Sequence, residues 1–596
     1  MNGLKASLSK RSAWWFYLLL VATVEVLLTF INLYYCIGYR NNMISPSGLL
    51  YFLNIHLGDA VLLLLPYWLV PARHRKWMWS IVALLALWCV AQVLYNLVYQ
   101  DVMPFSSLVL VSNVGDVLIG SVMGLLSFTS LIPIIIVVGA YLIYRKCVSG
   151  GKMVALTAKA KCVAVAASVL VATLTQLISH IYNYTQSQDD MTFVEFVPDD
   201  YSCMQARFKS YFIRHGFVAY CTYCACTSIE RPITADEKAE IERFINDEMP
   251  HYTDNPYSTS ERKNLVMIIV ESLNSWAIGL TIDGREITPT LNAIARDTTA
   301  LVALNVKAQV KNGRSSDGKF IYDTGLLPLT GKAVAMYYSD ANYPALPKAL
   351  KGYDAVEVTP DAPGLWNNET NSRSYSFRTI YNSRQFKPRF IANGYRIDEV
   401  VFDEAFKVIQ GQKQPFFTQV VTGSMHSPYD SPPADTTWIS HSKAYTPQVR
   451  NYLERAAYTD HHLGIFLKRL ADSRLMQNSV IVIASDHTEL IDGAPCELTA
   501  PGATGNECTL LILNSGHPGR IENIVGQIDV YPTLLDIMGA NQYKWKGLGY
   551  SLLRTPVDAA AIYEGEVVGN TSSPIIPHIT RAWRVSDLLI RKHWFK

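Results

Sequence analysis

Five long apolar runs in the first part of the chain limit the folds that this sequence can adopt. They cover residues 14–35, 49–70, 77–99, 117–144 and 162–182. Each is long enough to cross the hydrocarbon core of a bilayer as a helix, which takes about 20 residues. The first run is too long for a signal peptide and lacks a small-residue cleavage site. We therefore expect residues 1–182 to form a membrane domain of five transmembrane helices.

The cations beside these runs predict how the chain crosses the membrane. They lie in the N-terminal tail and in the loops after the second and fourth runs: Lys5, Lys10, Arg11, Arg73, Arg75, Lys76, Arg145, Lys146, Lys152, Lys159 and Lys161. Loops rich in lysine and arginine stay in the cytoplasm. The N-terminus is therefore expected in the cytoplasm, and everything after Tyr182 outside it. The whole chain has 52 basic and 50 acidic residues, and this balance gives no support to a nucleic-acid partner.

Three ionisable residues lie within the apolar runs: Glu25 in the first, and His56 and Asp59 in the second. An ionisable residue at membrane depth is a functional candidate. Pairing within the helix bundle, or a place near an interface, explains them equally well, and we assign no site to them.

Residues 183–262 are expected to connect the membrane domain to a second domain. Residues 211–220 are aromatic and amphipathic, as in a helix on the outer membrane surface, although packing against the second domain explains them equally well. A charged helical pattern covers 235–247, and the Pro, Asn and Ser content of 250–262 is typical of a linker. Cysteines in an exported region suit disulfides, and Cys496 and Cys508 are the favoured pair.

Strand-like and helix-like segments alternate from residue 263 to the end of the chain. Short apolar runs at 265–270, 416–421, 480–484 and 509–513 are typical of buried strands, whereas 289–297 and 452–471 have helical periodicity. This alternation predicts an α/β domain over 263–596 with a doubly wound sheet. Ligands of such sheets bind beyond the carboxyl ends of the strands.

Two acidic residues and a histidine follow predicted strands closely. Glu271 ends the first strand, and Asp486 and His487 follow 480–484 after one serine. A carboxylate at a strand end is most often a cap or a surface charge. Two such ends with an attached imidazole, however, supply three of the four ligands of a metal site, and a hydroxyl is a suitable fourth.

The segment 311–320 provides that hydroxyl. It contains Gly313, Arg314, Ser315, Ser316 and Asp317, and by itself it is typical of a polar turn that caps a helix. With a divalent cation bound beside it and a helix N-terminus beneath it, Ser315 would be an activated nucleophile. Its target would be a phosphate or sulfate ester whose oxygens Arg314 and the amides near Ser316 would hold.

Taken together, these motifs resemble the lipoteichoic acid synthase (phosphoglycerol transferase) branch of the alkaline phosphatase superfamily. The resemblance rests on Val270-Glu271-Ser272, Gly313-Arg314-Ser315-Ser316-Asp317 with Phe320, Tyr458-Thr459-Asp460, Ser485-Asp486-His487 and residues 527–535. It implies five transmembrane helices followed by an extracytoplasmic, alkaline-phosphatase-like α/β domain with a doubly wound mixed sheet. It also implies a multi-pass protein of the bacterial cell (inner) membrane.

The same resemblance implies roles for individual residues. The ligands of one divalent metal, usually Mn²⁺ or Mg²⁺ but Zn²⁺ in phosphoethanolamine relatives, match Glu271, Ser315, Asp486 and His487. The nucleophile is usually threonine in this branch, and here it is Ser315. Arg314 replaces the usual lysine. His426 matches a histidine that contacts the phosphate of the transferred group, and Trp366 matches a tryptophan of the substrate pocket.

Asn368 departs from the family pattern. Two residues after that tryptophan the lipoteichoic acid synthases carry an arginine on the phosphoglycerol group, whereas this chain has Asn368. The substrate pocket is therefore expected to be less cationic, unless Arg373 or Arg378 reaches it. Sulfatase activity is disfavoured, because Ser315 lacks the Pro-x-Arg context needed for formylglycine formation.

The sequence favours metal-dependent transfer of a phosphoglycerol-type head group from a membrane phospholipid to a glycan or lipid acceptor. A phosphoserine at Ser315 would be the intermediate, with His426 or water moving the proton. One alternative is a phosphoethanolamine transferase, which the segment 485–489 favours slightly. The others are a phosphatase or phosphodiesterase that uses water, and a non-enzymatic membrane sensor. The sensor is disfavoured because all four expected ligands are present.

Overall fold

The computed structural model describes residues 2–36, 46–99, 102–103, 126–148, 155–186, 207–228, 232–249, 254–258, 262–330, 332–386, 398–427, 429, 445–491, 493–494, 507–554, 560–563 and 566–595. These residues form two compact units, which divide between residues 230 and 231. Each unit has a hydrophobic core of its own.

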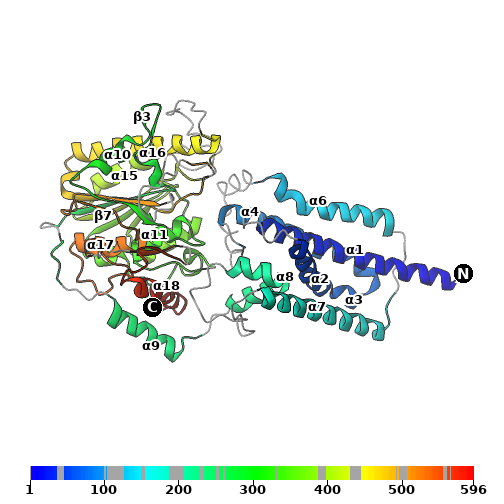
Figure 1. Ribbon diagram of the computed structural model, residues 1–596. Coiled ribbons are helices and arrows are strands. Elements are labelled where there is room, and N and C mark those ends of the chain that lie inside the picture. The colour runs from blue at the N-terminus through cyan, green and yellow to red at the C-terminus, as the bar shows by residue number, and fades with distance from the viewer. Residues whose placement is uncertain are drawn as a thin grey trace. The chain divides into compact units, whose positions relative to one another are not determined.

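Helices, most of them long and apolar, form the described part of the first unit (Figure 1). They are α1 (Asn2–Cys36), α2 (Pro46–Leu63), α3 (Pro66–Leu69), α4 (Met78–Tyr99), α6 (Phe128–Ile143), α7 (Ala158–Gln186) and α8 (Arg207–Ser228). Five spans in the described ranges are long and apolar enough to cross a membrane: Trp14–Tyr35, Gly48–Leu69, Ala72–Asn96, Phe128–Cys147 and Ala158–Tyr182. They coincide with the five predicted runs, of which residues 117–125 lie outside the described ranges.

Two of the three ionisable residues in the apolar runs pair within the bundle. His56 Nδ1 lies 3.2 Å from Asp59 Oδ2, and Asn32 Nδ2 lies 2.8 Å from His56 Nε2. Asp59 also accepts hydrogen bonds from the backbone N–H groups of Phe217 (2.7 Å) and Val218 (3.0 Å) in α8. His56 and Asp59 therefore pair within the helix bundle, which is the alternative to a functional site that the sequence analysis gave.

The aromatic segment 211–220 packs among the membrane helices. Phe212 and Tyr220 of α8 are fully buried, and the Phe212 ring lies beside those of Tyr35 and Trp88. Gly216, with φ 83°, interrupts the helix. Asp59 thus caps the second half of a broken helix, and α8 belongs to the first unit.

A mixed β-sheet organises the second unit. Its nine strands in the described ranges follow the order β10-β4-β9-β8-β1-β7-β5-β6, with β11 beside β4. They are β1 (Asn264–Val270), β4 (Leu301–Lys307), β5 (Asp354–Val358), β6 (Thr379–Tyr381), β7 (Phe416–Val421), β8 (Ser479–Ser485), β9 (Cys508–Leu513), β10 (Gly519–Ile521) and β11 (Val525–Gly526). β1 is parallel to β7 and β8, whereas β9 is antiparallel to β8 and β4. The predicted mixed sheet is confirmed.

Helices cover both faces of this sheet (Figure 1). α10 (Pro289–Arg296), α15 (Asp398–Gly411) and α16 (Pro447–Asp472) lie on one face, and α11 (Ser315–Thr324), α17 (Val530–Ile537) and α18 (Ile576–Arg591) on the other. Every residue of β1 and β8 is buried, because helices cover both faces of the sheet. Strands in this position are largely apolar along their whole length. Smaller elements are α9 (Ala235–Arg243), α12 (Val334–Tyr337), α13 (Leu346–Ala349), α14 (Asn368–Ser374), and the paired strands β2 (Thr281–Ile282), β3 (Arg285–Glu286), β12 (Ala560–Tyr563) and β13 (Glu566–Gly569).

The register of the two central strands, β1 and β8, brings their carboxyl ends to the same level. Val270, the last residue of β1, pairs with Ser485, the last residue of β8. Since parallel strands end at the same edge of a sheet, Glu271 and Asp486 leave that edge as neighbours.

Cys508 begins β9 as a fully buried free thiol. Cys496, the favoured disulfide partner of Cys508, lies outside the described ranges.

Candidate active site

Glu271, Asp486 and His487 meet at the carboxyl ends of β1 and β8. One possible ligand atom from each of these buried residues lies within 4.8 Å of the others. His487 Nε2 is 3.4 Å from Glu271 Oε1 and 3.6 Å from Asp486 Oδ2. The structure therefore brings together the carboxylates and the imidazole that the sequence singled out.

Ser315, the first residue of α11, completes this cluster. Its Oγ donates a hydrogen bond to Glu271 Oε2 at 3.0 Å and lies 3.2 Å from His487 Nε2. Arg314, with φ 47°, turns the chain sharply into the helix. The helix N-terminus adds a partial positive charge beside the hydroxyl.

Gly318 allows α11 to approach the second strand end closely. A Cβ on Gly318 would collide with the backbone carbonyl of Asp486. The absence of a side chain here therefore helps to hold Ser315, three residues earlier, against the carboxylates.

Hydrogen bonds hold one nitrogen of His487 and one oxygen of Asp486, which leaves His487 Nε2 and Asp486 Oδ2 as possible metal ligands. The Nδ1–H of His487 donates to the Thr488 carbonyl at 3.0 Å, so that Nε2 faces Ser315. Asp486 Oδ1 accepts from the N–H groups of Ser272 and His487, both at 2.7 Å. Asp486 Oδ2 is buried and has no hydrogen-bond partner among the described residues. Two carboxylates, an imidazole and a hydroxyl in this arrangement fit one divalent cation.

The pKa values of the cluster indicate an excess of negative charge. Burial raises the pKa of Asp486 to about 8, and the charge of Glu271 adds to the rise. Burial acts on Glu271 as well, but its hydrogen bond and charge interaction with His487 outweigh burial and hold its pKa well below the usual range. Burial lowers the pKa of His487, but chiefly the Asp486 charge raises it overall to about 9. Either a proton or a cation must therefore compensate the two carboxylates.

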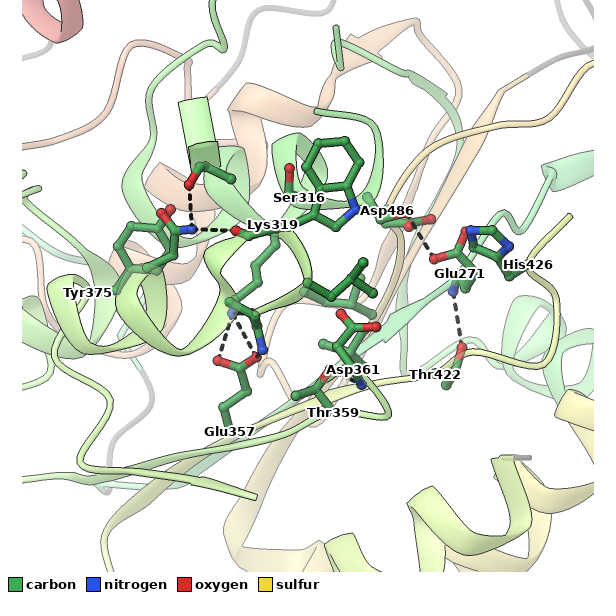
Figure 2. Close-up of a pocket in the computed structure, with 18 residues that line it drawn as sticks. Glu271, Ser316, Lys319, Glu357, Thr359, Asp361, Tyr375, Thr422, His426 and Asp486 are labelled. Atoms are coloured by element: carbon green, nitrogen blue, oxygen red, sulfur yellow. Dashed lines mark hydrogen bonds and ion pairs between the residues drawn. The ribbon is translucent and has the colours of Figure 1, made fainter. Parts of the chain in front are cut away.

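A pocket that is partly open to solvent lies beside this cluster (Figure 2), and Ser315 is one of its lining residues. Trp366, Asn368 and His426 line it, as the resemblance implied, together with Lys319 and Glu357. The Nδ1–H of His426 donates to the Ser427 carbonyl. Burial lowers the pKa of His426, although the charge of Glu271 opposes this, so the imidazole is kept neutral.

Residues 263–540 of this chain match the family model described as sulfatase. Lipoteichoic acid synthase 1 of Bacillus subtilis (strain 168) is 25% identical over 385 residues, which are 60% of this chain and 60% of that protein. The match thus spans less than two thirds of that relative.

Two solved structures share the fold. The lipoteichoic acid synthase LtaP of Listeria monocytogenes has a TM-score of 0.50 at 20% identity and covers 61% of this chain and 97% of its own. The integral membrane lipooligosaccharide phosphoethanolamine transferase A (EptA) of Neisseria meningitidis has a TM-score of 0.54 at 14% identity. The match covers 90% of this chain and 97% of that one.

Residues 263–540 thus form a sulfatase-family domain, and the chain is similar to lipoteichoic acid synthases. Its sulfatase-family domain holds the cluster described above, and its apolar helices precede that domain.

Asn368 has a different environment from the one expected in this family. Its Oδ1 accepts a hydrogen bond from Lys319 Nζ at 2.9 Å, and its Nδ2 donates to Glu357 Oε1 at 3.2 Å. Arg373 and Arg378, the two other candidate cations, pair with Glu369 and Asp354 at exposed positions and do not line the pocket. The cation in the pocket is Lys319, which sequence reasoning missed, although it lies one helical turn after Ser315.

Arg314 also differs from the expectation. Its guanidinium pairs with Glu489, and it is not among the residues that line the pocket. Glu489 is held in turn by Asn274, which accepts from the Glu489 N–H at 3.0 Å and donates to its carbonyl at 2.9 Å. The direct contact between Arg314 and a substrate phosphate therefore stays a prediction.

Proposed function

We propose that this protein transfers the phosphorylated head group of a membrane phospholipid to an acceptor hydroxyl through a phosphoserine at Ser315. The observation that carries the proposal is the placement of Ser315 Oγ, 3.0 Å from Glu271 Oε2 and 3.2 Å from His487 Nε2 at the start of a helix. A hydroxyl in these surroundings is suited to attack an electrophilic phosphorus atom.

One divalent cation belongs to the proposal, held by Glu271, Ser315, Asp486 and His487. Mn²⁺ or Mg²⁺ is the first choice, and Zn²⁺ the second. When bound, such a cation lowers the pKa of a coordinated hydroxyl and offsets charge on a phosphate. The buried Asp486 Oδ2, which has no hydrogen-bond partner within the described ranges, supports its presence.

In the first step, Ser315 Oγ loses its proton and forms a bond to the head-group phosphorus, the bond from phosphorus to the diacylglycerol oxygen breaks, and that oxygen takes up a proton so that diacylglycerol leaves as an alcohol. In the second step, an acceptor hydroxyl attacks the same phosphorus and releases Ser315. His426 lines the pocket and burial lowers its pKa, which supports a role in which its Nε2 takes the acceptor's proton. Trp366 and Asn368 line the space for the head group.

Two head groups are candidates. The lipoteichoic acid synthase relative favours a phosphoglycerol-type group. Phosphoethanolamine is the second candidate, because Asn368 replaces the family's arginine and neither Arg373 nor Arg378 lines the pocket. A glycan or lipid hydroxyl is the proposed acceptor, and water would make the protein a phosphodiesterase. The arranged cluster disfavours a non-enzymatic sensor.

The membrane helices suit a lipid donor, since they keep the domain at the surface where the donor lies. We propose a bacterial inner-membrane protein with a cytoplasmic N-terminus and an extracytoplasmic sulfatase-family domain, on the basis of the loop cations.

The test is diacylglycerol release by the purified full-length protein in neutral-detergent micelles. Mn²⁺ is supplied with phosphatidylglycerol or phosphatidylethanolamine, and EDTA replaces Mn²⁺ in the blank. We expect release that needs the metal and is abolished in Ser315→Ala. The matched control is Ser473→Ala, an exposed serine after the end of α16. Undiminished release by Ser315→Ala would remove Ser315 from its role.

A further inference from the structure

Two cations close to Ser315 in the sequence already have carboxylate partners. Lys319 Nζ lies 2.7 Å from both carboxylate oxygens of Glu357, and Arg314 pairs with Glu489. Lys319 is the only lysine or arginine among the described residues that line the pocket. Among the described lining residues, every lysine or arginine is therefore already paired, and none is left for an anionic head group.

Asp361 is the carboxylate in this pocket without such a counter-charge. It follows β5 by three residues and lines the pocket, and none of the described lysines or arginines forms an ion pair with it. In Figure 2 it lies between the Lys319–Glu357 pair and Glu271. A group bound beyond the metal cluster would therefore meet a carboxylate that lacks a cationic partner.

Two anions and one cation act on the Asp361 carboxyl. Burial in the pocket raises the pKa of Asp361 to about 7, the charges of Glu271 and Glu357 raise it further, and Lys319 only partly offsets them. A cation placed beside Asp361 would restore its ionised form, whereas a second anion there would be repelled.

A balance of charges then distinguishes the possible donors. A divalent cation would offset Glu271 and Asp486, while Glu357 offsets Lys319. What is left is the phosphate of the donor, which is negative, and Asp361, which becomes negative once a cation lies beside it. A donor whose head group carries a positive charge at the end remote from its phosphate matches this pattern, and one with a neutral end does not.

We propose that the pocket selects a zwitterionic phospholipid whose head group ends in an ammonium, and that Asp361 accepts the hydrogen bonds of that ammonium. This inference rests on the proposed function. The aromatic ring of Trp366, which lines the same pocket, provides a further surface that attracts a cation. Phosphatidylethanolamine is the simplest donor of this class.

The experiment compares donors and variants in the full-length protein. Diacylglycerol release is measured with Mn²⁺ in neutral-detergent micelles that contain equal mole fractions of phosphatidylethanolamine or phosphatidylglycerol. We expect kcat/KM to be at least about tenfold higher with phosphatidylethanolamine. Asp361→Asn is expected to remove most of this preference by raising KM for phosphatidylethanolamine, with little effect on phosphatidylglycerol. Asp354→Asn, which alters an aspartate of β5 that pairs with Arg378 outside the pocket, should retain the preference.

Each contrary outcome has a distinct meaning. Faster release from phosphatidylglycerol overturns the inference and leaves head-group transfer intact. An equal loss with both donors in Asp361→Asn overturns the role of Asp361, because a structural defect does not distinguish head groups. If diacylglycerol is released from neither donor, the proposed function is overturned and the inference with it.

Discussion

The Nζ of Lys319 lies 2.7 Å from each carboxylate oxygen of Glu357, and both residues are buried. Asn368 Oδ1 and Ser372 Oγ accept two further hydrogen bonds from the same ammonium, at 2.9 and 2.6 Å. An ion pair removed from water is tolerated when its remaining hydrogen-bonding capacity is satisfied in this way.

Loss of one partner of this pair is expected to be more harmful than loss of both. Lys319→Met leaves the Glu357 carboxylate buried without a cation, which costs about 3–5 kcal/mol. We expect a lower thermal unfolding midpoint for this variant and a substantial recovery in Lys319→Met/Glu357→Gln. Scanning fluorimetry of the detergent-solubilised chain measures both. A double variant that unfolds as early as the single one would contradict the pairing.

Asp486→Asn is expected to remove the stabilisation that added metal gives. Asp486 Oδ2 has no hydrogen-bond partner in the described part of the chain, and a bound cation stabilises the folded state by an amount that rises with the logarithm of its affinity. The unfolding midpoint should rise with Mn²⁺ in the parent protein and stay unchanged in the variant. Asp472→Asn, exposed on α16, is the control. An unchanged Mn²⁺ effect in Asp486→Asn would exclude Asp486 as a ligand.

Gly318→Ala is expected to displace α11 from the strand ends, because its Cβ would collide with the Asp486 backbone. We expect both weaker metal-induced stabilisation and loss of diacylglycerol release. Gly411→Ala, at the last residue of α15, places its Cβ where no atom lies within 4 Å and should leave both unchanged. Normal metal binding by Gly318→Ala would show that this close approach is not needed.

His426 is expected to act in the second step. Burial lowers its pKa from the ordinary value of 6.5, so the neutral, proton-accepting form persists as the pH falls to 6.5 and is lost only below it. Decay of the phosphoserine in single-turnover experiments should therefore slow only below pH 6.5. In His426→Gln the intermediate should accumulate, because its formation is affected less than its decay. Equal slowing of both steps would assign His426 to metal or donor binding instead.

The sequence allowed prediction of the parts of the site that lie at strand ends. The apolar runs of β1 and β8 are unbroken because helices cover both faces, and Glu271, Asp486 and His487 follow them within two residues. The segment around Ser315 lacks such a pattern by itself. Its position became predictable only through the family's ordered motifs.

The environment of the pocket was not predictable in this way. β5 was missed because it is short and contains Asp354 and Glu357, which are typical of a surface segment. Glu357 is buried because Lys319, 38 residues earlier, pairs with it. Asn368 joins the same network from α14. Such contacts depend on tertiary packing, and no local periodicity reports them.

The most direct measurement is the mass of Ser315 during turnover without an acceptor. The full-length protein is incubated with Mn²⁺ and a phospholipid donor, quenched in acid and digested for peptide mass spectrometry. We expect the mass of the head-group phosphate on Ser315 in the parent protein and in Ser473→Ala, and no adduct in Ser315→Ala. Continued release of diacylglycerol with Ser315 unmodified, or an adduct on another residue, would contradict a phosphoserine mechanism at this site.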